Sequence, residues 1–167
     1  IVDQMDMPFM QPNCTMVRMA ETTWETSWVV TPGFENSEAG YEAWLAANGG
    51  EKVHVVISEI VTNNTCVAVG SQKLSCDYVE LTNLGSETVT LDAYLTNDPE
   101  QPLKWHIPSL TLAAGERAVV CCDTNGDGVE VAPFGLSRSG CTVMLTSNLG
   151  NVLSRIECPS LEADCAY

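Results

Sequence analysis

Short apolar runs separated by turn residues fill the chain from about residue 53 onward. The runs are rich in Val, Ile, Leu, Thr and Tyr, and Gly, Asn, Asp and Pro lie between them. Such runs favour strands, and strands at these intervals are typical of a β-sandwich or barrel. The pattern therefore predicts an all-β domain with strands at residues 53–61, 78–83, 88–95, 103–107, 116–122, 141–146 and 152–156.

Residues 78–83 show how such a strand divides its side chains. Alternate residues of a strand point to opposite faces, so Val79, Leu81 and Asn83 share one face. Glu80 lies on the other face, with Tyr78 and Thr82. A carboxylate buried without a partner is costly, so we expect Glu80 to be paired or partly exposed.

One short helix is predicted before these strands. Ser37 is a suitable N-cap, and an acid such as Glu38 is favourable in the first turn of a helix. Tyr41, Trp44 and Leu45 then share one face. The Asn-Gly-Gly sequence at 48–50 ends the helix. We therefore divide the chain into an N-terminal segment (1–36), a helix with its linker (37–50) and a β domain (51–167).

The two ends of the chain resemble each other. Residues 1–16 align with residues 152–167 without a gap, and proline and cysteine coincide in both stretches. A tandem array with a period of about 151 residues explains this, and chance similarity of two short β segments is the alternative. In the array, the first stretch would be a closing strand of the preceding module. Its candidate assembly positions are Ile1, Val2, Met5 and Met7.

The charge of the chain limits its partners. Seven Lys and Arg against 22 Asp and Glu give a formal net charge of −15. Such a surface repels phosphate backbones, so we expect no nucleic-acid binding. No apolar run approaches the roughly 18 residues that cross a bilayer, so no membrane span is expected. The chain starts at Ile1 rather than Met, so we expect a processed product or part of a longer chain.

Eight cysteines favour disulfides and an oxidising, extracellular location. Zinc binding is disfavoured because the spacing lacks close Cys-x-x-Cys pairs and no His lies near a Cys. Free buried thiols are the alternative. The stretch 66–76 joins two predicted neighbouring strands, so we expect a disulfide between Cys66 and Cys76. The other candidates are Cys14, Cys121, Cys122, Cys141, Cys158 and Cys165.

The stretch 123–128 follows the Asp-x-Asn-x-Asp-Gly pattern of calcium loops. Asp123, Asn125 and Asp127 would supply side-chain oxygens, and Val129 would supply a carbonyl. Position 12 of the pattern is Phe134, so the usual bidentate acid is missing. A polar turn that binds no metal is the alternative, because Asn-Gly and Asp-Gly are strong turn formers.

Other candidate chemistry is weaker. No Gly-x-Ser-x-Gly elbow occurs, and His54 and His106 are more typical of structural or surface positions than of a catalytic triad. We therefore expect no enzyme activity. Trp24, Trp28 and Trp44 could form a carbohydrate platform, although aromatic residues in such a closing segment more often serve packing.

Residues 55–167 resemble the lamin tail domain of secreted bacterial proteins. The resemblance is carried by Val-Ile-Ser-Glu-Ile at 56–60, Asp-Tyr-Val-Glu-Leu-Thr-Asn at 77–83, Trp-His-Ile-Pro at 105–108, Leu-Ala-Ala-Gly-Glu at 112–116 and Phe-Gly-Leu-Ser at 134–137. Residues 28–36 look like the tail that closes such a module. The resemblance implies an immunoglobulin-like β-sandwich, and it brings no catalytic motif.

These features together predict an extracellular structural or adhesive repeat of a cell-surface protein or filament. We expect it to associate with itself head to tail, through tandem modules or strand exchange. The alternative is an accessory module of a surface enzyme or adhesin that binds a glycan or a protein. That alternative predicts an exposed aromatic patch, with Trp24 and Trp105 contributing to binding.

Overall fold

The computed structural model describes residues 4–10, 14–50, 52–68 and 75–167. The chain forms two compact units, Ile1–Glu51 and Lys52–Tyr167. We refer to the second unit as the β domain.

The first unit contains a small hairpin and the predicted helix. Strands β1 (Thr15–Arg18) and β2 (Trp24–Ser27) pair antiparallel, and the Arg18 guanidinium lies 4.5 Å from the centre of the Trp24 ring. Helix α1 (Glu38–Ala47) begins at Ser37, whose hydroxyl accepts a hydrogen bond from the Gly40 N–H at 3.1 Å. The helix buries Trp44. The sequence-based prediction of this helix and of its cap is confirmed.

Residues 4–10 form no strand, although the sequence predicted an N-terminal strand segment. Met5 is partly buried, whereas Met7 is 62% exposed and Phe9 is 94% exposed. Ile1 and Val2 lie outside the described residues. The strands of this unit instead lie nearer the helix, in the β1–β2 hairpin.

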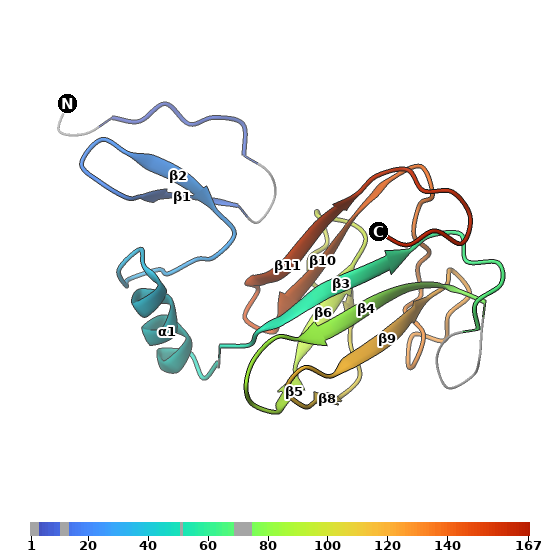
Figure 1. Cartoon of the computed structure of the whole chain (residues 1–167). Coiled ribbons are helices and arrows are strands. Elements are labelled where there is room, and N and C mark those ends of the chain that lie inside the picture. Colours follow the sequence, from blue (N-terminus) through green and yellow to red (C-terminus); the bar gives the residue numbers. More distant parts are fainter. Residues whose placement is uncertain (1–3, 11–13, 51, 69–74) are drawn as a thin grey trace. The chain divides into compact units, whose positions relative to one another are not determined.

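The β domain is built from short antiparallel strands (Figure 1). In chain order they are β3 (Val55–Val61), β4 (Asp77–Asn83), β5 (Val89–Leu91), β6 (Ala93–Thr96), β7 (Trp105–His106), β8 (Leu110–Leu112), β9 (Arg117–Cys122), β10 (Cys141–Ser147) and β11 (Val152–Cys158). One sheet has the order β3-β4-β9 and another has the order β11-β10-β6-β7. Strands β5 and β8 pair separately. The domain is thus a β-rich, sandwich-like fold, as the apolar pattern predicted.

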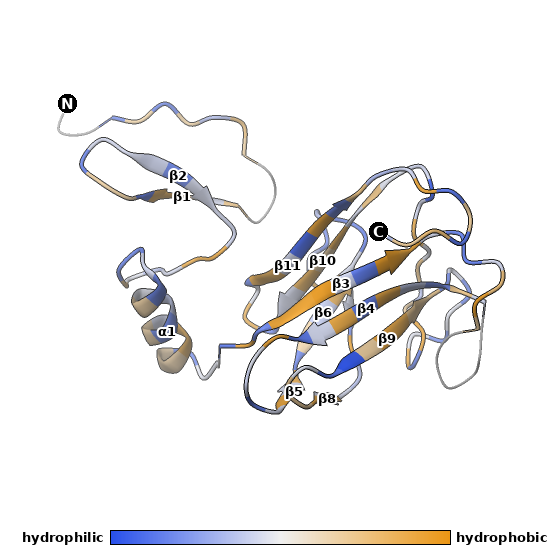
Figure 2. Ribbon diagram, in the orientation of Figure 1, coloured by the Kyte–Doolittle hydropathy of each residue, from blue (hydrophilic) through white to orange (hydrophobic). Residues whose placement is uncertain are grey.

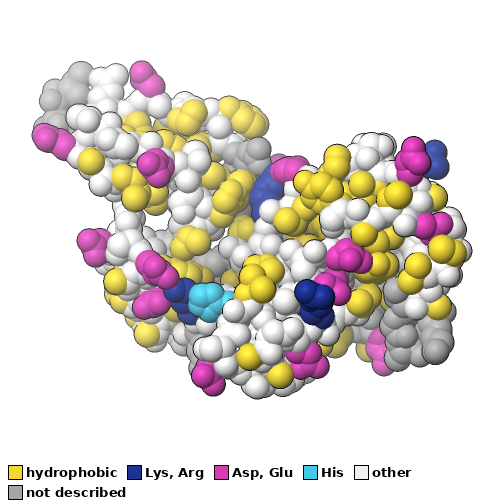
Figure 3. Space-filling model, viewed as in Figure 1, with side chains coloured by type: hydrophobic (Ala, Val, Ile, Leu, Met, Phe, Trp, Pro, Cys, Tyr) yellow, Lys and Arg dark blue, Asp and Glu magenta, His cyan; other side chains and the backbone are white. Residues whose placement is uncertain are grey.

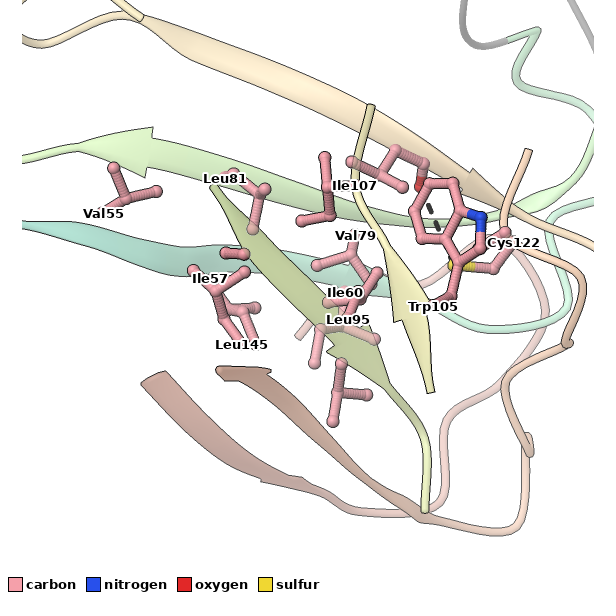
Figure 4. Packing of buried hydrophobic residues seen from close by; sticks show 14 of the residues in the cluster. Val55, Ile57, Ile60, Val79, Leu81, Leu95, Trp105, Ile107, Cys122 and Leu145 are labelled. Carbon is pink, nitrogen blue, oxygen red and sulfur yellow. Dashed lines mark hydrogen bonds between the residues drawn. The ribbon is translucent and has the colours of Figure 1, made fainter. Parts of the chain in front are cut away.

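The core lies between the two larger sheets and takes side chains from both (Figure 4). The β3-β4-β9 sheet contributes Ile60 and Leu81, and the four-stranded sheet contributes Leu95 and Leu145. All four side chains are fully buried, with an exposed fraction of 0%. The alternation predicted for β4 is confirmed, because its inward-facing residues are buried. Burial of apolar surface stabilises a fold by about 25 cal/mol per Å², so this shared core holds the two sheets together.

Strand β3 is interrupted by a bulge at its centre. The register of β3 against β4 shifts between Ile57 and Glu59, which leaves Ser58 as the extra residue. Figure 2 shows this hydrophilic interruption between apolar ends of the strand. The Ser58 hydroxyl donates to Glu80 Oε1 at 2.7 Å, and Arg117 Nε lies 3.6 Å from the same oxygen. Glu80 is therefore paired and partly exposed, as expected.

Two predicted strands differ most from the structure, and strand β8 was not predicted. The expected strand at 88–95 is divided into β5 and β6, which belong to different sheets. Asp92 lies at the division, and its carboxylate binds His106 Nε2 and Asn148 Nδ2 at the surface. The expected strand at 103–107 is reduced to Trp105 and His106 in β7. The Asp92 carboxylate thus links this division to β7 and to the turn after β10.

Acidic side chains are spread over the surface of both units, among few basic ones (Figure 3). This distribution agrees with the formal net charge of −15. Within the described residues, none of the helices combines the length and the apolar character needed to cross a bilayer.

Candidate functional site

The cysteines of the β domain gather at one end of the strands. Neighbouring strands run antiparallel, so the end of β3, the start of β4 and the end of β9 lie together. The start of β10 and the end of β11 likewise lie together. We define the cysteine-rich end by these residues: Cys66, Cys76, Cys121, Cys122, Cys141, Cys158 and Cys165. Among the residues that the structure describes, no three His, Cys, Asp or Glu side chains are grouped to hold a metal ion.

The chain returns to β3 at this same end, as Figure 1 shows for its red C-terminal part. After β11, Ala166 forms an antiparallel bridge with Val61. The Ile60 N–H donates to the Tyr167 carbonyl at 3.0 Å, and the Tyr167 N–H donates to the Ile60 carbonyl at 2.9 Å. Residues 152–167, the closing segment, thus first form β11 in one sheet and then pair with β3 of the other.

Asp164 fixes the turn within the closing segment. Its φ angle is 59°, a left-handed conformation in which Asp and Asn are enriched. Its carboxylate accepts hydrogen bonds from the Thr65 N–H and hydroxyl, both at 2.6 Å, and from the Cys66 N–H at 3.2 Å. These hydrogen bonds, those from Thr65 foremost, lower the pKa of Asp164 below its usual value of 3.8. The carboxylate therefore joins the closing segment to the loop after β3.

The depressed pKa of Asp164 predicts a pH-dependent contribution to stability. Its carboxylate stabilises the fold fully above the usual pKa of 3.8, and this contribution is lost as pH falls through the lower folded-state pKa. We expect Asp164→Asn to lower the melting temperature at neutral pH. As pH falls below about 3.8, the melting temperature of the variant should approach that of the unmodified chain. Thermal melts from pH 7 to pH 2.5 measure this difference. A difference that stays constant over that range would contradict the role of the carboxylate.

Cys66 and Cys76, the pair expected from the sequence, lie in different surroundings. Cys66 is exposed, and its thiol is hydrogen-bonded to Asp164, which raises the pKa of Cys66. Cys76 is buried in a small cluster with Cys121 and Val131. Burial, followed by the contact with Cys121, raises the pKa of Cys76 to about 12. The structure therefore brings Cys76 to Cys121, a neighbour that sequence spacing did not indicate.

The candidate calcium loop is held by bonds to its own backbone. Asp123 Oδ1 accepts from the Asn125 N–H at 2.8 Å. Asp127 Oδ1 accepts from the N–H groups of Val129, Glu130 and Val131 at 2.9, 3.0 and 3.1 Å. These bonds lower the pKa of Asp127. They are the contacts of a polar turn, and calcium binding at this loop stays a prediction that a melt with and without chelator tests.

A polar pocket of about 500 Å³ opens at the same end of the domain. Its lining includes Asn63, Arg138, Ser160 and Glu162. Asn63 has a φ angle of 57°, and its carbonyl accepts from the Asp164 N–H at 3.3 Å. Two residues with left-handed backbone thus lie side by side, where the closing segment meets the loop after β3.

Two of the candidate tryptophans are buried, and the other two are partly buried. Trp44 is 9% exposed and Trp105 is 6% exposed, so neither belongs to an exposed patch. Trp24 is partly buried beside Arg18, and Trp28 is also partly buried. Packing takes up the side chains of Trp44 and Trp105, so neither supplies the exposed aromatic patch that the glycan-binding alternative predicts.

One histidine has a carboxylate partner. His106 Nε2 lies 2.7 Å from Asp92 Oδ1, and the imidazole packs edge-on against Tyr94 at 4.9 Å between ring centroids. This pair lies on the surface and joins β7 to the β5–β6 corner. The contacts with Asp92 and Tyr94 fix the position of the imidazole.

Comparisons with known proteins add no relative to this picture. No family model matches the sequence, and no curated protein matches it either. The resemblance to the lamin tail domain therefore depends on the sequence stretches at 56–60, 77–83, 105–108, 112–116 and 134–137.

Proposed function

We propose that the chain is an extracellular structural or adhesive repeat that assembles head to tail with further modules of its kind. One observation carries the proposal. The closing segment, residues 152–167, completes the β domain, and a matching sequence stands at residues 1–16. Residues 4–10 of this matching stretch form no strand and expose Met7 and Phe9, and its last two residues begin β1. The chain thus contains a second copy of a closing sequence in addition to residues 152–167, which supports a neighbouring module as its partner.

The contacts of the closing segment explain why the match is meaningful. Ser154 Oγ accepts from the Ile57 N–H at 3.1 Å, and the matching position holds Asp3, which also accepts hydrogen bonds. Asp164 has left-handed backbone, and the matching position holds Asn13, the other residue type enriched in that conformation. The similarity therefore includes the polar positions on which closure depends, as well as the apolar ones.

We also propose that the β domain is an immunoglobulin-like sandwich of the lamin-tail type. The quoted stretches lie at structurally demanding places. The stretch at 77–83 is β4, which pairs with both β3 and β9. The stretch at 112–116 contains Gly115, whose φ angle is 74° and whose N–H donates to the Asn83 carbonyl at 2.9 Å. Because these stretches lie at positions that the fold requires, their similarity to the lamin tail domain supports a shared fold and is harder to explain by similar amino-acid composition alone.

A segment exchange tests the proposal. In the full chain, residues 152–167 are replaced by a copy of residues 1–16, so that Met stands at the position of the buried Cys158. We expect the β domain to fold cooperatively, because the apolar pattern and the closing contacts are kept. The larger side chain at position 158 should cost about 1–3 kcal/mol. Chemical denaturation followed by circular dichroism measures the transition.

The matched control carries the same sixteen residues in scrambled order. We expect this control to lose the cooperative transition, because apolar and polar residues no longer alternate on the correct faces. If the exchanged and the scrambled chains unfold alike, residues 1–16 are no closing sequence and the repeat proposal fails. Sedimentation of the full chain and of a chain lacking residues 1–36 then shows whether separate chains associate through this segment.

A further inference from the structure

At the cysteine-rich end, two pairs of cysteines are neighbours in positions that a disulfide can bridge. One pair belongs to each of the two larger sheets. We propose that Cys141 is joined to Cys158 and that Cys76 is joined to Cys121, whereas Cys122 stays a free thiol. The pairing is argued from strand register and burial alone. The proposed extracellular location enters only because it would supply the oxidant that the disulfides need.

The first pair spans β10 and β11. Cys141 and Cys158 are direct partners in the antiparallel register of these strands. Opposed residues of an antiparallel pair have Cα atoms about 4.5 or 5.5 Å apart, and both separations lie within the range that a disulfide bridges. Cys158 is 4% exposed and Cys141 is half-buried. The pair closes the open end of the hairpin, opposite the turn between the two strands.

The second pair joins the start of β4 to the end of β9. Cys121 is the register partner of Tyr78, and Cys76 lies two residues before Tyr78. Residues two apart in extended chain point to the same face, so Cys76 and Cys121 are diagonal neighbours on one face. Both are buried, and they contact each other in the cluster with Val131. Asn64 Nδ2 holds the Cys76 carbonyl at 2.9 Å and so fixes the backbone there.

Cys122 is kept from both pairs by the alternation of β9. It follows Cys121 directly, so its side chain points to the opposite face, into the main core. There it is 1% exposed, and its Sγ lies 3.9 Å from the Val120 carbonyl (Figure 4). Adjacent cysteines on opposite faces of a strand cannot pair without distortion of the backbone. Cys122 is therefore a natural internal control.

Each disulfide would form by exchange with an external disulfide such as oxidised glutathione. One cysteine thiolate attacks the external disulfide, which gives a mixed disulfide and releases one small thiolate. The second cysteine thiolate attacks the mixed disulfide, which forms the protein S–S bond and releases the other small thiolate. Two electrons pass from the cysteine pair to the oxidant, and the two cysteine protons end on the released thiols.

Burial makes this exchange slow once the domain has folded. It raises the pKa of Cys76 to about 12 and that of Cys141 to about 11, so little reactive thiolate exists near pH 7. The pairs should therefore form during folding. In the folded, reduced chain, the exposed Cys66 and Cys165 should react first with an alkylating reagent.

Refolding the full chain with reduced and oxidised glutathione tests the pairing. Remaining thiols are alkylated under denaturing conditions, and peptides are mapped without reduction. We expect a Cys141–Cys158 link and a link from Cys76 to the peptide that contains Cys121. Cys122→Ala should keep both links, whereas Cys121→Ala should remove only the second. Reduction should lower the melting temperature of the oxidised chain, and less so in Cys121→Ala.

Other results overturn the proposal. A Cys66–Cys76 link would contradict it, and so would free thiols at all four paired positions. It would also be contradicted if the link from Cys76 survived in Cys121→Ala but was lost in Cys122→Ala. The same mapping on native material separates the two proposals. If the pairs form in glutathione buffer but all thiols are free in native material, the pairing stands and the extracellular placement fails.

Discussion

Replacing Trp105 with alanine should lower the free energy of unfolding of the β domain by about 3–5 kcal/mol. The indole is 6% exposed and packs in the main core (Figure 4). Its Nε1 also donates to the Gly128 carbonyl at 2.8 Å, which ties the loop after β9 to the core. Alanine leaves a cavity and removes that donor. Urea denaturation followed by circular dichroism measures the change.

Two further variants separate the contributions to this loss. Trp105→Phe keeps much of the apolar volume but has no donor for Gly128, so we expect a smaller loss than for alanine. Leu103→Ala changes a residue that is 47% exposed in the same stretch, and its effect should stay within about 0.5 kcal/mol. If Trp105→Ala and Leu103→Ala cost the same, Trp105 is not the core residue that the structure indicates.

The elements with strong local signals could be predicted from the sequence. Helix α1 begins at Ser37 and buries Trp44 and Leu45, as its cap and apolar spacing predicted. In β4, the alternation of polar and apolar residues was enough to predict that Val79 and Leu81 are buried. Both predictions depend on residues only a few positions apart, so they could be made without knowledge of the tertiary structure.

The division of residues 88–95 into β5 and β6 depends on distant partners. Leu91 pairs with Leu110, whereas Leu95 pairs with both Trp105 and Leu145. Apart from Asp92, the residues of the stretch are compatible with one strand, so the local pattern contains only a weak break. Only the choice of partner places the two halves in different sheets, and that choice is a property of the whole domain.

The cysteines show a similar limit of local reasoning. Cys66 and Cys76 were predicted to pair because they flank a loop that joins two neighbouring strands. The structure instead brings Cys76 to Cys121, which is much farther along the chain, because β4 pairs with β9. For Cys141 and Cys158, counting outward from the turn could have indicated a pair, but the register shift between Leu145 and Thr146 changes that count. A bulge of this kind has no reliable sequence signal.

The closing segment combines both situations. Its similarity to residues 1–16 was visible in the sequence, whereas its return to β3 through Ala166 was not. Asp164 could have been noticed, because its match is Asn13 and both residue types favour left-handed backbone. Its partner Thr65 lies almost a hundred residues away, so only the structure reveals the contact.

The second large effect is expected at Asn83, a polar residue that is 1% exposed. Its Nδ2 donates to the carbonyls of Glu87, Leu112 and Ala113 at 2.8, 3.1 and 3.1 Å, and its Oδ1 accepts from the Gly85 N–H at 2.9 Å. One side chain thus satisfies the backbone of two loops. Because each buried group left unsatisfied costs about 1–3 kcal/mol, Asn83→Leu should lower the free energy of unfolding by roughly 3 kcal/mol or more.

Asn83→Asp distinguishes hydrogen bonding from shape, because it keeps the size of the side chain and removes its donors. At neutral pH its carboxylate would face carbonyl oxygens without a donor, so we expect a loss at least as large as for leucine. A protonated carboxyl regains one donor. The folded state of this variant therefore favours the protonated form, and that stabilisation is present at low pH and is lost as pH rises above about 4.

The deficit of Asn83→Asp in the free energy of unfolding, relative to the unmodified chain, should shrink on acidification, whereas that of Asn83→Leu should not. Denaturation curves at pH 4 and pH 7 measure both deficits, and parallel behaviour of the two variants would show that Asn83 acts through its volume and not through its donors.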